Sequence, residues 1–256
     1  MDINKVFRVM FQTAWAILFV SMHVPLLSQE YKHGTAIVIF RMTDTIYAAA
    51  DSKVQSDNPL VSSTGCKIRT VGDIGIALAG LYSEQASRFD VVQIAIEAAR
   101  SEGTIFQKME TLERAIRQPL ISAWSNILKR NPLRIINDYN SQIAFFGFYE
   151  GVPFVIRDWF YPAMSFLTVS DMRIERMIVP RSSSRETPHL VFLAQSKEIN
   201  DALEAAPFSV DNWTQALNRI IQFAIDKRHD VGPPVDILLL TRSGKKWIQK
   251  KDECPE

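Results

Sequence analysis

The sequence predicts an α+β protein in which two antiparallel sheets are packed between layers of helices. Strand and helix patterns come in blocks along the chain: four strands, two helices, four strands, two helices and two strands. Such blocks argue against a doubly wound parallel sheet, in which strands and helices alternate. The chain has 256 residues, enough to bury one sizeable core. The expected architecture is a four-layer αββα sandwich.

The first half of the chain supplies four apolar runs and two amphipathic segments. The runs are bounded by polar turns and cover residues 35–40, 47–50, 67–71 and 76–80. Residues 84–101 and 106–129 place apolar side chains at helical spacing. Pro132 is expected to end the second helix.

The second half repeats this order. Strands are expected at 141–149, 153–157, 164–169 and 189–194, and helices at 196–206 and 211–227 with Asp211 as a plausible N-cap. A hairpin of residues 235–241 and 246–248 closes the chain. The aromatic run Trp159–Tyr161 falls outside these strands and is interpreted as core, a subunit contact or a pocket wall, with core the commonest outcome.

The first 28 residues are predicted to be a signal peptide. Lys5 and Arg8 precede a charge-free stretch with an apolar centre, and Ser28 offers a small residue at the cut. The protein is therefore expected to be secreted or periplasmic. An uncleaved anchor formed by residues 9–28 is an alternative, because the stretch is nearly long enough to span a membrane, as is a long propeptide that packs on the fold.

Composition excludes several classes of partner and cofactor. The net charge is +1 with both signs interspersed, which does not favour a nucleic-acid surface. No metal-ligand spacing exists, and no cofactor is expected. A disulfide between the two cysteines, Cys66 and Cys254, is possible but unpromising, because one lies beside Lys67 and the other in the polar C-terminal segment.

Thr35 is the candidate nucleophile. Inside a chain its hydroxyl is a poor nucleophile, but at a new N-terminus its own α-amine, with an ordinary pKa of about 7.7–8.0, can take the hydroxyl proton. Gly34 allows the strained backbone that self-cleavage before Thr35 requires. Read alone, Gly34-Thr35 is a common way to begin a strand.

Asp51 and Lys67 are the candidate charged partners of Thr35. Asp51 follows the second apolar run and Lys67 begins the third, so adjacent antiparallel strands would bring both charges to the Thr35 hydroxyl. A buried lysine beside a buried aspartate is tolerable only as a pair. Alone, Asp51 would be read as a turn former and Lys67 as a solvated charge at a sheet edge.

These residues, in this order, resemble proteasome β-type subunits and their bacterial relatives among the N-terminal nucleophile (Ntn) hydrolases. The Gly34/Thr35 junction resembles the self-cleaved propeptide boundary of the family. Asp51-Ser52-Lys53 falls on the acidic residue followed by serine and a basic residue, and Lys67 falls on the active-site lysine. Gly80, at the end of Ile76–Gly80, resembles the glycine whose amide donates to the oxyanion, one residue earlier than usual.

The resemblance also implies the αββα fold and assembly into a homo-oligomer, with a ring possible. It is strong from Gly34 to Gly80 and architectural afterwards. Where the family has a Gly-Ser-Gly-like turn, the chain reads Ala194-Gln195-Ser196. Ser52 is a candidate supporting residue. Ser196 and Asp211 could stand in as two more, although each of these two is more simply read as a helix cap.

The sequence thus divides into a signal peptide (1–28), a short propeptide (29–34), a proteasome-like domain (35–250) and a polar tail (251–256). The predicted function is a self-processing threonine hydrolase that cuts amide bonds, most simply in peptides. Two alternatives remain open: an acylase acting on small amides, and a catalytically silent assembly or binding protein. A membrane partner is expected only if residues 9–28 stay attached.

Overall fold

The computed structural model describes residues 31–33, 35–56, 62–130, 139–166, 168–180, 188–194 and 212–254. In chain order its strands and helices are β1 (Tyr31–His33), β2 (Ala36–Arg41), β3 (Thr45–Ala50), β4 (Lys53–Ser56), β5 (Ser62–Thr64), β6 (Ile68–Val71), β7 (Ile74–Gly80), β8 (Ser83–Glu84), β9 (Phe89–Asp90), α2 (Val91–Arg100), α3 (Ile105–Arg130), β10 (Ser141–Tyr149), β11 (Val152–Ser165), β12 (Thr168–Val179), β13 (His189–Ala194), α5 (Trp213–Lys227), β14 (Asp236–Thr241) and β15 (Gly244–Gln249).

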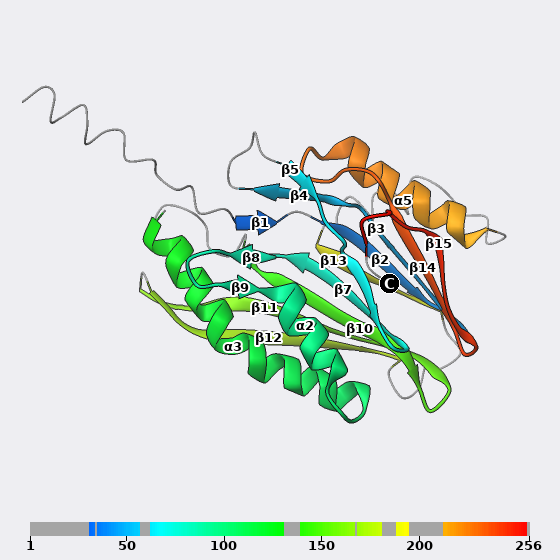
Figure 1. The fold of residues 1–256 in the computed structure, drawn as a ribbon, viewed down its shortest axis with the longest axis horizontal. Coiled ribbons are helices and arrows are strands. Elements are labelled where there is room, and N and C mark those ends of the chain that lie inside the picture. Colours follow the sequence, from blue (N-terminus) through cyan, green and yellow to red (C-terminus); the bar gives the residue numbers. More distant parts are fainter. Residues whose placement is uncertain are drawn as a thin grey trace, which may run out of the picture.

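The α+β class predicted from the sequence is confirmed. Two main antiparallel sheets have the strand orders β13-β2-β3-β14-β15 and β12-β11-β10-β7-β6. Three helices occur in the described ranges, with α2 and α3 on one side of the strands and α5 on the other (Figure 1). None of these helices is long and apolar enough to cross a membrane.

Three clusters of buried side chains hold these parts together. One joins α2 and α3 to β7 and β10, the second lies between the two main sheets, and the third joins α5 to β2 and β3. Strand β2 shows the pattern most simply: Ile37 and Ile39 face the other sheet, whereas Ala36 and Val38 face α5. Covered on both faces, the strand is apolar from Ala36 to Phe40 and ends in the buried Arg41.

A third, smaller sheet was not predicted. Its order is β5-β4-β1-β8-β9, so that β1, from the expected propeptide, lies between β4 and β8. Residues 31–33 are therefore held as a strand. The predicted helix 196–206 lies outside the described residues, and the N-cap of α5 is Asn212, whose side chain accepts a hydrogen bond from the Gln215 amide, rather than Asp211.

The predicted strands 153–157 and 164–169 are parts of a longer hairpin, which corrects the sequence interpretation. β11 and β12 pair from Val155–Val179 to Ser165–Thr168. The aromatic run Trp159–Tyr161 therefore lies within β11, where Phe160 is fully buried. Of the roles considered for this run, Phe160 therefore has that of a core residue.

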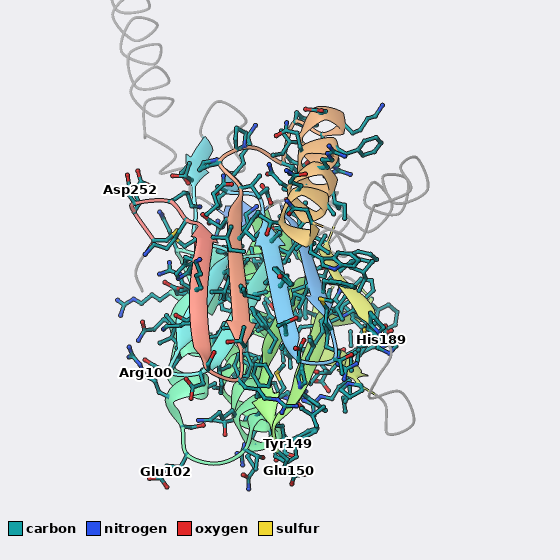
Figure 2. All side chains as sticks on the ribbon, turned by 90° about the vertical axis from the view of Figure 1, so that its right-hand side faces the viewer. Arg100, Glu102, Tyr149, Glu150, His189 and Asp252 are labelled. Atoms are coloured by element: carbon teal, nitrogen blue, oxygen red, sulfur yellow. A yellow bond between two sulfur atoms is a disulfide. The ribbon has the colours of Figure 1, made fainter. Side chains whose placement is uncertain are left out.

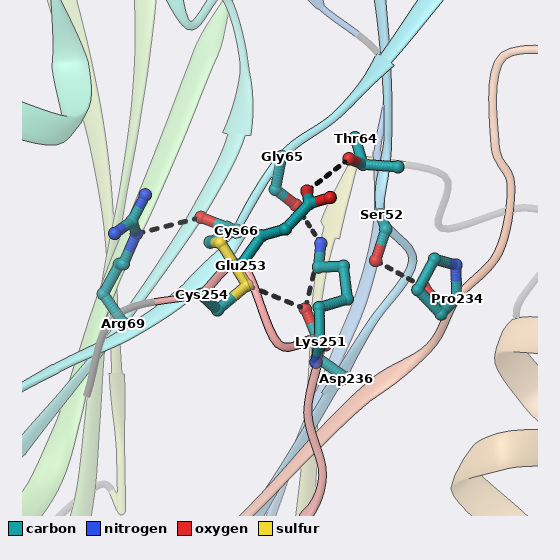
Figure 3. Close-up of a disulfide and its surroundings, with 10 residues drawn as sticks. All are labelled: Ser52, Thr64, Gly65, Cys66, Arg69, Pro234, Asp236, Lys251, Glu253 and Cys254. Atoms are coloured by element: carbon teal, nitrogen blue, oxygen red, sulfur yellow. Dashed lines mark hydrogen bonds and ion pairs between the residues drawn. A yellow bond between two sulfur atoms is a disulfide. The ribbon is translucent and has the colours of Figure 1, made fainter.

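Cys66 and Cys254 form a disulfide, contrary to the sequence expectation, with Cα atoms 5.6 Å apart (Figure 3). The path of the chain explains the pairing. Lys245 of β15 donates to the Thr70 hydroxyl of β6, and six residues later Lys251 donates to the Gly65 carbonyl. The C-terminal chain thus passes from Thr70 to Gly65, and a turn in which the Cys254 amide donates to the Lys251 carbonyl over 3.1 Å brings Cys254 back to Cys66. Segment 251–254, expected to be a polar tail, packs on the domain.

Candidate active site

The candidate residues gather at one end of the two main sheets. β2, β10 and β14 begin at this end, and β3, β7 and β13 finish there, because neighbouring strands are antiparallel. In Figure 2 this end carries the C-terminal segment, marked by Asp252, and lies opposite the turn marked by Glu150. The sandwich therefore brings residues distant in sequence to one site.

Thr35 lies directly before β2 and is fully buried. The amide of the next residue, Ala36, donates to Oδ1 of Asp51 over 2.7 Å, and the Ala36 carbonyl accepts from the Asp51 amide over 3.1 Å. Asp51 thus continues the β2–β3 pairing and fixes the backbone beside Thr35. Gly34, the other half of the predicted cleavage junction, lies outside the described residues.

The Asp51 carboxylate joins three parts of the chain. Oδ1 accepts from Ala36 and from Nζ of Lys67, and Oδ2 accepts from the amides of Lys53 (3.1 Å) and Gly232 (3.2 Å). A fully buried carboxylate that accepts four hydrogen bonds, one of them from an ammonium, is well compensated for its loss of water. The carboxylate is held in a fixed orientation.

Lys67 pairs with Asp51 as the sequence predicts, but not from an adjacent strand: β6 lies in the other main sheet from β2 and β3. The Nζ–Oδ1 distance is 2.7 Å, and neither side chain is exposed. Burial lowers the pKa of Lys67 to about 8, although the neighbouring Asp51 charge raises it. An ammonium with a pKa close to neutrality can give up and regain its proton at low cost.

Gly80 is the last residue of β7, and Lys67 directly precedes β6. Because these two strands are antiparallel, both residues lie at the same end of the strand pair. The Leu78 amide donates to the Lys67 carbonyl over 2.9 Å, and the Leu81 amide donates to Asn140 on the opposite edge of β7. Since amides alternate between the two edges of a strand, the Gly80 amide is directed to the Lys67 edge, beyond the first residue of β6. Its φ of +89° and the Asn140 oxygen, 2.0 Å from where a Cβ would stand, require glycine.

The three supporting residues named from the sequence have different outcomes. Ser52 is buried, but its hydroxyl donates to the Pro234 carbonyl, so it anchors the 232–234 loop. Ser196 and Asp211 lie outside the described residues and stay predictions. β13 ends beside the site, since Ala194 pairs with Ala36, and the φ of Ala194 is +60°.

The loop of residues 229–234 belongs to the site and was missed by the sequence analysis. Its Gly232 amide binds Asp51, and its Gly232 carbonyl accepts from the amides of Ser52 and Lys53. A Cβ on Gly232 would stand 3.1 Å from the Lys53 side chain. The signal that could have revealed it is the run Gly232-Pro233-Pro234, a rigid turn directly before the last apolar strand.

Asp230 adds a second carboxylate near the pair. It is mostly buried and accepts two hydrogen bonds from Arg228, at 2.7 and 3.0 Å. Its negative charge raises the pKa of Lys67, and the positive charge of Lys251 lowers it. Within the described part of the chain, no group of three or more histidine, cysteine or acidic residues could hold a metal ion.

Comparisons with known proteins show similarity in fold alone. No protein-family model and no curated protein matches the chain. An Anbu (Gly-1) mutant from Hyphomicrobium sp. strain MC1 is similar with a TM-score of 0.49 and 16% identity, covering 86% of this chain and 89% of that one. Anbu (ancestral beta-subunit) from Yersinia bercovieri gives 0.48 and 13%, covering 86% and 88%. At these identities and TM-scores, the functional proposal rests on the site geometry instead.

Proposed function

We propose that the chain is a threonine hydrolase that cuts its own backbone between Gly34 and Thr35 and then cleaves amide bonds, most simply in peptides. The observation that carries the proposal is the buried Lys67–Asp51 pair, whose carboxylate also binds the amide next to Thr35. A buried ion pair costs solvation and is weak evidence for stability. Its position beside a buried threonine therefore favours a chemical role.

The self-cleavage step prepares the catalytic base. In the uncut chain the Thr35 nitrogen is part of a peptide bond and cannot accept a proton. Attack of the Thr35 hydroxyl on the Gly34 carbonyl carbon breaks the C–N bond and leaves an ester on Thr35 with a free amine. Water then hydrolyses this ester, which releases the segment ending at Gly34 and exposes Thr35 as the first residue.

The mature site would then act on an amide substrate. The Thr35 oxygen bonds to the substrate carbonyl carbon while the Thr35 amine takes the hydroxyl proton, and the Gly80 amide stabilises the oxyanion. The amine passes this proton to the leaving nitrogen, and water hydrolyses the acyl ester in a second cycle. Lys67, as an ammonium held by Asp51, lowers the proton affinity of the hydroxyl.

A silent assembly or binding protein is the second candidate. The observation that favours it is Ala194, which holds a left-handed φ of +60° where the resemblance implies a glycine-containing turn. An altered turn beside Ala36 could weaken the support of Thr35. An acylase on small amides uses the same chemistry and differs only in substrate, and in each case a homo-oligomer is the expected assembly.

The N-terminal mass of the mature protein tests the proposal. We expect Thr35 as the first residue of the wild type, and an uncut, folded and inactive Thr35→Ala variant. Thr70→Ala is the matched control, because Thr70 is also a buried threonine but contacts Lys245 away from the site. Normal cutting in Thr35→Ala would remove Thr35 as the nucleophile, and an uncut wild type would favour the silent protein.

The disulfide also bears on localisation. Stable disulfides form in oxidising compartments and are rare in the cytosol, so the Cys66–Cys254 bond favours export, in line with the predicted signal peptide. Cell fractionation of the full-length protein tests this: we expect the processed chain outside the cytoplasm. Recovery in the membrane fraction would support an anchor formed by residues 9–28, and a reduced cytosolic protein would contradict export.

A further inference from the structure

The C-terminal segment Lys251–Cys254, here called the clasp, is bound to the residues that lead into Lys67. Cys254 is joined to Cys66 by the disulfide, and the Thr64 hydroxyl donates to the Glu253 carboxylate over 3.1 Å. Lys251 donates to the Gly65 carbonyl. Figure 3 shows these contacts around residues 64–66. Each of the three residues before Lys67 is thus held by the clasp.

The opposite side of this segment is also fixed. The Gly65 amide donates to the Ser52 carbonyl over 2.7 Å, and a Cβ on Gly65 would stand 2.4 Å from the Val54 side chain. Ser52 directly follows Asp51. The segment before Lys67 is therefore clamped between the clasp and the chain that carries the partner carboxylate.

The clasp is anchored in turn by a buried ion pair. Nζ of Lys251 lies 3.2 Å from Oδ2 of Asp236, and the Lys251 amide donates to Oδ1 of the same carboxylate over 3.0 Å. Asp236 is fully buried at the start of β14, and the exposed fraction of Lys251 is 9%. A buried pair of this kind needs a fixed geometry on both sides, so it sets the position of the clasp.

We propose that the clasp is a positioning element of the active site: through Cys254 and Lys251 it fixes the backbone of residues 64–66, so that the Lys67 side chain meets Asp51. This inference rests on the proposed hydrolase function. A misplacement of about 1 Å at a catalytic group can lower a rate by about a hundredfold. None of the clasp residues touches the reacting atoms; they act through Lys67.

The first experiment removes the disulfide in a Cys66→Ser, Cys254→Ser double variant. Mature enzyme is assayed on a peptide substrate well below the melting temperature of the variant. We expect kcat to fall by about tenfold to a hundredfold, with KM nearly unchanged, because the substrate contacts remain while Lys67 is displaced. A purely structural bond would lower the melting temperature and leave kcat at the wild-type value, and that result would overturn the proposal.

The second experiment keeps the disulfide and removes the charge, in Lys251→Met. Three charged groups face Lys67: Asp51 after β3, Asp230 before β14 and Lys251 after β15. Loss of Lys251 raises the pKa of Lys67, so the high-pH limb of kcat, where the Lys67 ammonium loses its proton, should move to higher pH. Lys245→Met is the control, since Lys245 contacts Thr70 on the same hairpin.

The two proposals fail in different ways. If Thr35→Ala is inactive while the double cysteine variant keeps wild-type kcat and Lys251→Met keeps the wild-type pH limb, the hydrolase stands and the clasp proposal falls. If Thr35→Ala is cut and active, the hydrolase assignment falls first. Should the double cysteine variant not fold, kcat of Lys251→Met decides alone, because this variant loses the contacts with Gly65 and Asp236: a wild-type kcat overturns the proposal, and a fall of about tenfold or more supports it.

Discussion

The Lys67 ammonium lies 2.7 Å from the Asp51 carboxylate, and neither side chain reaches solvent. The pair is joined to the candidate nucleophile by one further bond, from the Ala36 amide to the same carboxylate oxygen. A single oxygen therefore accepts both from Lys67 and from the backbone beside Thr35. A substitution of Lys67 is therefore expected to alter the position of Thr35 through this oxygen.

Lys67→Met tests the pair directly. The variant keeps the length of the side chain but leaves Asp51 buried without a counter-ion, so the free energy of unfolding should fall by about 3–5 kcal/mol. Activity should fall by about a hundredfold or more, and Lys67→Arg should not restore it, since a planar guanidinium is not a compact ammonium. Lys108→Met, which removes a lysine bound to the Ala99 carbonyl far from the site, is the control for both measurements.

The lowered pKa of Lys67 predicts a dependence of stability on pH. The unfolded chain has a lysine with the ordinary pKa of 10.5, whereas in the folded chain burial lowers it to about 8. Between these values the unfolded state binds a proton that the folded state does not, so the contribution of Lys67 to the free energy of unfolding rises with pH. The full rise is about 3 kcal/mol.

Urea unfolding of wild type and Lys67→Met at pH 7.5 and pH 10 measures this rise, because other titrating groups cancel in the difference. The wild type should gain on the variant at the higher pH. An equal difference at both values would show that the pKa of Lys67 is not lowered.

Part of the site could be predicted from the spacing of Thr35, Asp51 and Lys67, which lie at the ends of short apolar runs. Antiparallel pairing of β2 and β3 brings Thr35 and Asp51 together as expected. Lys67 reaches Asp51 by another route, because β6 belongs to the other main sheet and the contact crosses the space between the two sheets. The structure confirms that Asp51 and Lys67 meet. Prediction worked here because each residue is defined by its own strand and not by a distant loop.

The long hairpin could not be predicted because its buried face carries a charge pair. Asp158 of β11 is fully buried and lies opposite Arg176 of β12, which donates two hydrogen bonds of 2.8 Å to it. An aspartate at a position that should be apolar interrupts the period-two pattern, so the pattern predicts a strand that ends at Arg157. Only the partner strand shows that the charge is compensated.

The disulfide and the Gly232 contact were missed for a different reason. Cys66 and Cys254 are 188 residues apart in sequence, and only the path of β14 and β15 brings them together. Likewise Gly232 binds Asp51 through its backbone amide, and the run Gly232-Pro233-Pro234 indicates a turn but not the group that the turn binds. Contacts of this kind follow from the fold and not from local patterns.

Gly80→Ala should damage both fold and activity. The new methyl group would stand 2.0 Å from the Asn140 carbonyl oxygen, and an alanine at φ +89° is strained, so the free energy of unfolding should fall by about 3 kcal/mol. Movement of the Gly80 amide should also lower kcat more than it raises KM.

Gly72→Ala is the control: its φ is +57° but nothing lies within 4 Å of the added Cβ, so only about 1 kcal/mol should be lost. Equal effects of the two changes would show that Asn140 does not restrict position 80.

Ala194→Gly tests the altered turn beside the site. A left-handed alanine costs about 1–2 kcal/mol, and the greater freedom of glycine in the unfolded chain offsets about 0.5–1 kcal/mol of the gain. The substitution should therefore raise the free energy of unfolding by about 0.5–1 kcal/mol, because Ala194 has a φ of +60°. Ala163→Gly, in strand β11 at a φ that is not positive, should lower it by a similar amount.

Denaturant unfolding gives both values, and a parallel assay of N-terminal cutting shows whether the turn limits self-cleavage at Thr35. If a silent wild type becomes self-cutting as Ala194→Gly, position 194 is the cause of the silence; if cutting is unchanged while stability rises, the turn affects folding alone.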